Sequence, residues 1–229
     1  MEFTLLKYAI FIIVAFFCIV LHSFVQAYVA LLNGDRTARL AGRLTLNPVR
    51  HFDFVGFLLL VFCKVGFTKP IPINAYYFKN KKVGVLTVPL SGLLLNLLIA
   101  FISVPLLLLC VKYLQPVMVS TVAGQRGFAL IESFFNALIS VGIGLFLFNL
   151  LPIYPLDGYN VVEGLFGCTN GFVRWLRDYA KYYFLLAVIT FYFAKLFGLP
   201  DYLNPAYWYM DVFGGMIREL FVNIWLPLF

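Results

Sequence analysis

The sequence is poor in charge and rich in apolar residues. Only 12% of its 229 residues are charged, whereas 63% are hydrophobic. A soluble domain carries about 25% charged residues, so the composition excludes a soluble globular protein and indicates an integral membrane protein. The four cysteines form no CxxC pair, which leaves no cysteine-based metal knuckle. We interpret them as small apolar side chains.

The charge that is present is mostly positive. A net charge of +7 can indicate nucleic-acid binding, but in a membrane protein basic residues gather in the cytoplasmic loops that set topology. Residues 33–82 hold nine basic residues against two acids. Arg174, Arg177 and Lys181 mark a second basic loop. We therefore expect both regions in the cytoplasm and no nucleic-acid partner.

Long apolar runs predict an all-α fold, a polytopic bundle of transmembrane helices with about five to six membrane segments. A shorter run at 54–67 has about half the length that a spanning helix needs, so we expect it to be re-entrant or interfacial. The tail at 204–229 could span the membrane or lie in its interface. Spans are expected at residues 5–32, 83–113, 128–151 and 182–199, with an external loop at 115–127.

One stretch cannot be helical. Pro70 and Pro72 alternate with other residues between Lys69 and Asn74, and each proline fixes its backbone and removes a donor. Extended backbone at membrane depth is tolerated only where protein or a watery cavity covers it. We expect this stretch to lie along a groove near the polar residues described next.

Two polar clusters are expected to meet inside the membrane. His22 and Gln26 are four residues apart, so they share a helix face near the end of the first span. Asp157 follows the end of the 128–151 span. Charge counting places both clusters at the same membrane face, where they can converge. Polar groups at such a depth are costly unless satisfied, which makes them candidates for function.

Several motifs, in this order, resemble the site-2 proteases, which are intramembrane zinc metalloproteases. The family carries H-E-x-x-H on its first core helix, where this chain has His22-Ser23-Phe24-Val25-Gln26. The resemblance covers residues 5–165 and implies a single membrane domain over 1–229, with that core at 1–165 and C-terminal helices at 166–229. The further matching motifs are G-D-x-T-A at 34–38, G-R-x-T-L-N-P at 42–48, H-x-D at 51–53, K-P-x-P-x-N at 69–74 and N-x-x-P-x-x-P-L-D-G at 149–158.

The resemblance implies that His22, a second histidine and Asp157 would bind zinc, and that a glutamate would act as general base. Here the base position is Ser23 and the second ligand position is Gln26. A serine hydroxyl is not basic near neutral pH, and zinc prefers imidazole, thiolate or carboxylate to an amide. We therefore expect no cofactor, or zinc if the site still functions. Three arrangements stay open: a hydrogen-bonded trio without metal, weak metal binding, and hydrolysis by a rearranged site.

The functional prediction is a catalytically degenerate, multi-pass protein of the cell membrane, with His22 and Asp157 toward the cytoplasm. It would hold a transmembrane protein or peptide in a groove formed with Asn74, Asn96, Asn149 and Pro152. The rival prediction is an active intramembrane metalloprotease that cleaves transmembrane substrates. Asp35 is interpreted as a cap or turn residue, and His51 as a position where the family also has histidine.

Overall fold

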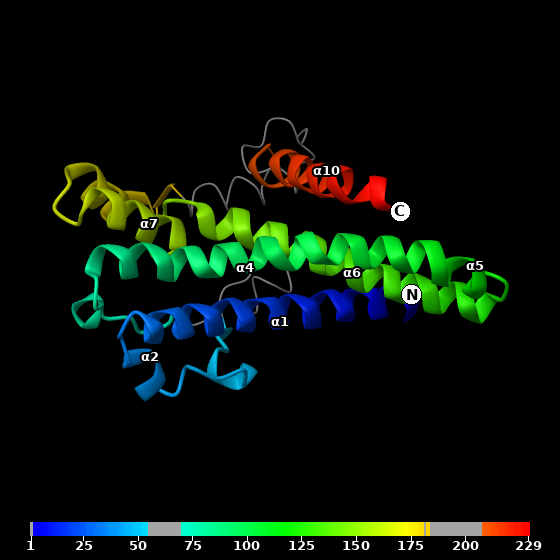
Figure 1. Cartoon of the computed structure of the whole chain (residues 1–229), viewed down its shortest axis with the longest axis horizontal. Coiled ribbons are helices and arrows are strands. Elements are labelled where there is room, and N and C mark those ends of the chain that lie inside the picture. Colours follow the sequence, from blue (N-terminus) through cyan, green and yellow to red (C-terminus); the bar gives the residue numbers. More distant parts are fainter. Residues whose placement is uncertain (1, 55–69, 181, 184–207) are drawn as a thin grey trace.

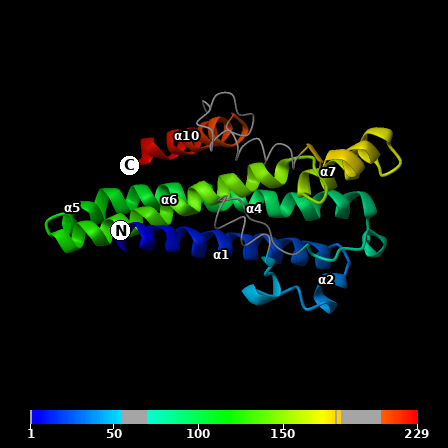
Figure 2. The same cartoon turned by 180° about the vertical axis from the view of Figure 1, so that it is seen from behind.

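Three long helices lie side by side and form the body of the molecule (Figures 1 and 2). The computed structural model describes residues 2–54, 70–180, 182–183 and 208–229. The long helices are α1 (Glu2–Leu32), α4 (Lys81–Leu109) and α6 (Val122–Leu150). By length and composition, Phe3–Leu32, Lys81–Met118 and Val122–Leu150 can each cross a membrane. The predicted all-α membrane bundle is confirmed, and the described ranges contain no strand.

Short helical elements connect and cover the long ones. They are α2 (Thr37–Leu40), η1 (Pro48–Arg50), η2 (Ala75–Tyr77), the π-helical turn η3 (Cys110–Leu114), α5 (Gln115–Met118), α7 (Asp157–Phe166), a helix at 171–180, the π-helical turn η5 (Trp208–Val212), α10 (Phe213–Trp225) and η6 (Leu226–Leu228). Residues 70–74 are not helical, as the two prolines require.

The core lies between the three long helices. Small residues on one face of α1, including Ala15 and Cys18, pack against Ala137 and Val141 of α6. A second cluster joins Ala100 of α4 to the other side of α6 and to α10. The outer faces stay apolar and exposed, as on α1, where Ile13 is 68% exposed. Such a surface suits lipid contact, because lipid tails solvate apolar side chains as well as a protein core does.

Glycine allows α4 and α6 to approach closely. A Cβ atom built on Gly142 would lie 2.7 Å from the backbone oxygen of Asn96, so any side chain at this position would push the two helices apart. Small residues at helix crossings are a general device of membrane proteins. This crossing fixes where α4 presents its polar side chains to α1.

The predicted external loop at 115–127 is wrong in extent. Helix α4 continues through η3 and α5 to Met118, and α6 begins at Val122 rather than near residue 128. The hydroxyl of Thr121 accepts a hydrogen bond from the Gly124 N–H at 3.0 Å and caps α6. This cap satisfies one of the free donors at the helix start, which explains why the helix begins before the apolar run does.

Two predicted membrane segments lie almost entirely outside the described residues. The re-entrant or interfacial segment at 54–67 is described only at Phe54, and the span at 182–199 only at its first two residues. In the tail, α10 packs against α4 and α6 through Phe221 and Trp225. Because residues 184–207 are outside the described part, whether the tail spans the membrane stays a prediction.

Candidate functional site

Helix α1 supplies the first part of the site. His22 and Gln26 are separated by one helical turn and are buried on the face that looks toward α4 and α7. Ser23 is also buried, with 2% of its surface exposed, but successive helical residues point about 100° apart around the axis. Ser23, which stands where the H-E-x-x-H motif has its glutamate, therefore points away from the line that joins His22 to Gln26.

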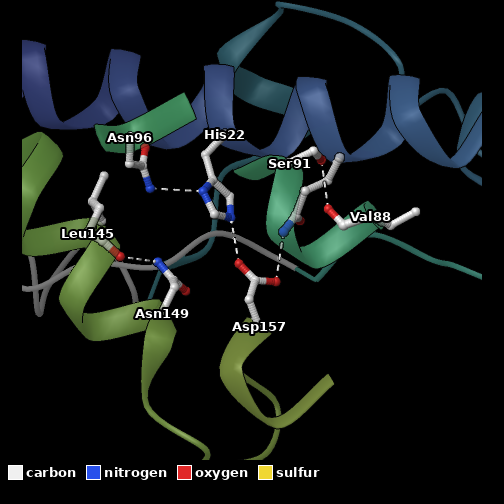
Figure 3. A network of polar contacts seen from close by, with 8 residues as sticks. His22, Val88, Ser91, Asn96, Leu145, Asn149 and Asp157 are labelled. Atoms are coloured by element: carbon white, nitrogen blue, oxygen red, sulfur yellow. Dashed lines mark hydrogen bonds and ion pairs between the residues drawn. The ribbon is translucent and has the colours of Figure 1, made fainter. Parts of the chain in front are cut away.

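Helix α7 supplies the carboxylate between them. Asp157 is the first residue of α7, where the helix dipole favours a negative charge. Its Oδ2 lies 2.9 Å from Nε2 of His22, and its Oδ1 accepts a hydrogen bond of 2.7 Å from Nε2 of Gln26. Both carboxylate oxygens therefore face side chains of α1, one through a hydrogen bond and the other through a close contact (Figure 3). The polar residues predicted to converge do so.

Helix α4 completes the network from the other side. The amide nitrogen of Asn96 lies 2.9 Å from Nδ1 of His22 (Figure 3). In this orientation the amide can only donate, so Nδ1 is the unprotonated nitrogen of the ring. Nε2 then carries the proton and lies 2.9 Å from Oδ2 of Asp157, an oxygen that has no hydrogen-bond partner among the described residues. Asn96 thus fixes the tautomer of His22 that suits the contact with Asp157.

A glycine on α4 makes room for this arrangement. A Cβ atom built on Gly92 would lie 2.5 Å from Cε1 of His22 and 2.8 Å from Nε2 of Gln26. These distances are well below van der Waals contact, so the two side chains fill the space that a larger residue would need. The site is closed by packing as well as by hydrogen bonds.

The side chains present do not fit a catalytic zinc. Such a site needs three protein ligands, usually drawn from histidine, cysteine and carboxylate, and an open position for water. His22 and Asp157 supply two, and Gln26 turns its nitrogen, a donor, toward the carboxylate. The structure groups no three His, Cys, Asp or Glu side chains suitably for a metal ion anywhere in its described part.

The other predicted groove residues take different roles. Asn149 donates to the carbonyl of Leu145 in its own helix at 2.9 Å (Figure 3). Asn74 is exposed, and its side chain accepts from the N–H of Tyr76 at the start of η2. Pro152 is exposed in the turn after α6. Contact of these residues with a partner stays a prediction.

Asp35 has a larger role than the cap or turn that the sequence suggests. It is fully buried, and Oδ1 accepts from the backbone N–H and the hydroxyl of Thr37. Its Oδ2 accepts from the backbone N–H of Asn74 at 2.7 Å. One carboxylate therefore ties the end of α1 to the extended stretch at 70–74. The short spacing to Thr37 signals a turn, but nothing in the sequence signals the bond to a residue so far along the chain.

His51, the second histidine of the chain, belongs to the loop and takes no part in the described contacts around His22. It is fully buried, and Nε2 donates to the carbonyl of Thr45 at 2.7 Å. Burial is the main cause that lowers the pKa of His51 below its ordinary value; the hydrogen bond to Thr45 opposes this effect, and the charge of Arg43 adds to it. A neutral His51 thus holds the loop together.

Comparison with known proteins gives one relative. The chain is 39% identical over 145 residues to a Bacillus subtilis (strain 168) protein named "Putative zinc metalloprotease YwhC", with 63% of this chain and 64% of that protein aligned. The chain thus spans less than two thirds of the length of this curated relative. No family model and no solved structure matches the chain. The chain is therefore similar to a protein of metalloprotease type.

Replacing Asp157 with alanine should destabilise the bundle. The Gln26 amide would lose its acceptor and Nε2 of His22 its neighbouring carboxylate oxygen while both stay buried, and an unsatisfied buried group costs about 1–3 kcal/mol. We expect a clearly lower midpoint of thermal unfolding in detergent, followed by circular dichroism. The control is Asp178→Ala, because the Asp178 carboxylate is 59% exposed in the helix at 171–180. Equal midpoints for the two variants would contradict the role given to the trio.

Replacing Asp35 with alanine should release the stretch at 70–74 from the end of α1. We expect amide hydrogen exchange around Asn74 to rise by about tenfold or more, because the opening of this stretch would no longer break a buried carboxylate contact. Exchange in α4 and α6 should stay unchanged. The control is Asn47→Ala, which removes an exposed cap from η1. Unchanged exchange near Asn74 in the Asp35 variant would show that this contact does not hold the 70–74 stretch against the end of α1.

Proposed function

We propose that this chain is a catalytically inactive relative of the site-2 proteases that holds a membrane-embedded partner without cleaving it. The observation that carries the proposal is the closed trio, in which Oδ1 of Asp157 accepts a hydrogen bond from Gln26 and Oδ2 lies 2.9 Å from Nε2 of His22. In this arrangement the carboxylate is held between His22 and Gln26, and Ser23 and Gln26 supply neither the base nor the second imidazole of the H-E-x-x-H motif.

The chemistry of the remaining side chains supports inactivity. Hydrolysis in a zinc site needs a metal to lower the pKa of water and a base to take its proton. Ser23 stands where the resembling motif has the glutamate, and its hydroxyl is not a base near neutral pH. Glu163, the acid that follows Asp157 most closely in sequence, is engaged elsewhere, accepting from the hydroxyl of Tyr159 at 3.3 Å.

The stretch at 70–74 supports a holding role. Its backbone is not helical, Asp35 fixes it at Asn74, and the side chain of Ile73 is 41% exposed. Backbone of this kind can pair with the edge of an unwound peptide, with main-chain hydrogen bonds giving affinity and side chains giving selectivity. The partner would be a transmembrane segment that unwinds locally beside this stretch, with the lipid bilayer around the remaining faces.

The second candidate is an active intramembrane metalloprotease. The name of the Bacillus subtilis relative favours this function. In this alternative Gln26 would have to turn its amide oxygen inward and release Asp157, so that zinc could bind between His22 and Asp157. In both candidates we place His22 and Asp157 toward the cytoplasm, because α1 ends beside the basic residues of α2 and the start of α4.

Metal analysis separates the two candidates. The purified wild-type protein should contain far less than one zinc per chain, since its donor set lacks a third strong ligand. The double variant Ser23→Glu, Gln26→His restores the pattern of the resembling motif and should bind zinc at about one per chain. The readout is elemental analysis after dialysis against a weak chelator.

A matched variant shows where the zinc binds. Adding Asp157→Asn to the double variant should abolish the gain, because the third ligand is then neutral. Stoichiometric, tightly held zinc in the wild type, together with peptide cleavage that is lost on adding Asp157→Asn alone, would replace the proposed function with the active protease.

Site-specific crosslinking tests the holding role. A photoreactive phenylalanine analogue at position 73 should capture a membrane protein in cells, because this position lies on the proposed edge. The same residue at position 13, on the exposed outer face of α1, is the control for chance collisions in the bilayer. Equal capture at the two positions would refute a partner at the 70–74 stretch while leaving the question of catalysis to the zinc experiment.

A further inference from the structure

The helix at 171–180 carries a row of aromatic side chains that the function proposed above does not use. Phe172, Trp175 and Tyr179 lie on it, and Tyr183 follows in the same phase. Their spacing of three and four residues places all four on one helix face. Each is exposed, with values between 44% for Trp175 and 59% for Tyr183. We call this set the aromatic ridge.

The rings of the aromatic ridge contact one another. Trp175 stacks on Phe172 with ring centroids 6.3 Å apart and planes inclined by 13°. The same indole lies 6.5 Å from the ring of Tyr179 and 5.8 Å from that of Tyr183. These distances are within the range of favourable aromatic pairs. The ridge is therefore a continuous apolar strip rather than a set of scattered exposed rings.

The rest of this helix is divided between a packed face and a charged face. Val173, Leu176 and Ala180 are buried against Tyr159 of α7. At about 100° per residue, their centre lies roughly a quarter turn from the centre of the ridge. Arg174 and Arg177 are exposed on the side opposite the ridge. The helix thus has three faces: one packs against α7, one carries the aromatic ridge, and one carries the two arginines.

The position of α7 sets the depth of this helix in the bundle. Asp157, at the start of α7, lies at the level of His22, which is ten residues before the end of α1 and thus about 15 Å inside it. Near the end of α7, a Cβ atom on Gly164 would touch Val85 and Leu86 in the first turns of α4. Helix α7 therefore rises from inside the bundle to the level where α1 ends and α4 begins, as Figures 1 and 2 show.

We propose that the aromatic ridge binds the headgroup region of the bilayer at this end of the bundle. The level where apolar spans end is the membrane–water interface, where tryptophan and tyrosine concentrate because one part of the ring is apolar and another polar. The arginines on the opposite face then point to water, which is the arrangement of an interfacial helix. Lipid is the occupant because the ridge lies at this level of a bundle whose long helices also expose apolar side chains, such as Ile13 of α1 and Leu94 of α4.

Depth-dependent fluorescence quenching tests the proposal on the full chain. The variant Trp208→Phe, Trp225→Phe leaves Trp175 as the sole tryptophan. After reconstitution into phosphatidylcholine vesicles, bromines near the headgroup end of the acyl chains should quench Trp175 more than bromines near the bilayer centre do. Iodide in the water should quench it weakly.

A control on the same helix distinguishes lipid contact from the mere presence of a bilayer. With Trp175→Phe and Arg174→Trp added to the other two changes, the single indole sits on the charged face. We expect quenching by the shallow bromines to be at least about twofold weaker there than at Trp175. Tyr179→Trp in the background without other tryptophans repeats the measurement on the ridge, in case a variant folds poorly.

Two results would overturn the proposal. Strong iodide quenching of Trp175 without bromine quenching would place the ridge in water. Weak quenching by both iodide and bromine would show that protein covers it, from this chain or a second copy.

Discussion

The carboxylate of Asp157 is the contact on which the arrangement of the helices depends. It joins α7 to α1 through His22 and Gln26, and Asn96 joins α4 to the imidazole of His22. In a membrane, lipid offers no hydrogen bonds to replace lost ones, so helices that share such a network are held in one register. The contacts that hold the helices together involve the same side chains that a metal would need as ligands. His22, Gln26 and Asp157 can therefore either join the helices in this way or bind a metal.

Glycine makes that network possible. Gly92 brings α4 against His22 and Gln26, and Gly142 brings α6 against the backbone of α4 at Asn96. Polar contacts of 2.7–2.9 Å between side chains on different helices require this close approach, because asparagine and histidine are short. The small residues and the polar contacts thus act together, because close helix crossings allow short polar side chains on different helices to contact one another.

Much of the fold and part of the site follow from the sequence. Apolar runs identify the three long helices, prolines exclude helix at 70–74, and the four-residue spacing of His22 and Gln26 puts them on one face. Charge counting brings Asp157 to their level. Hydropathy misses the start of α6, because the Thr121 cap acts before the apolar run begins. The bond from Asp35 to Asn74 depends on how the loop folds in space, and local sequence carries no signal for it. The aromatic ridge could be predicted only if residues 171–180 were known to be helical, and their mixed polar and aromatic sequence does not indicate a helix.

The bond between Asp35 and Asn74 has a consequence for how this protein can vary. Together with the bond from the Lys79 N–H to the Asn33 carbonyl at 2.8 Å, it ties the end of α1 to the stretch that leads into α4. Residues 36–73 thus connect two points that are tied together, and the entropy of closing such a connection grows only with the logarithm of its length. The connection can lengthen, shorten or accept an inserted module at little cost to the register of α4 against α1. Its length can thus change in evolution while the buried polar centre stays as it is.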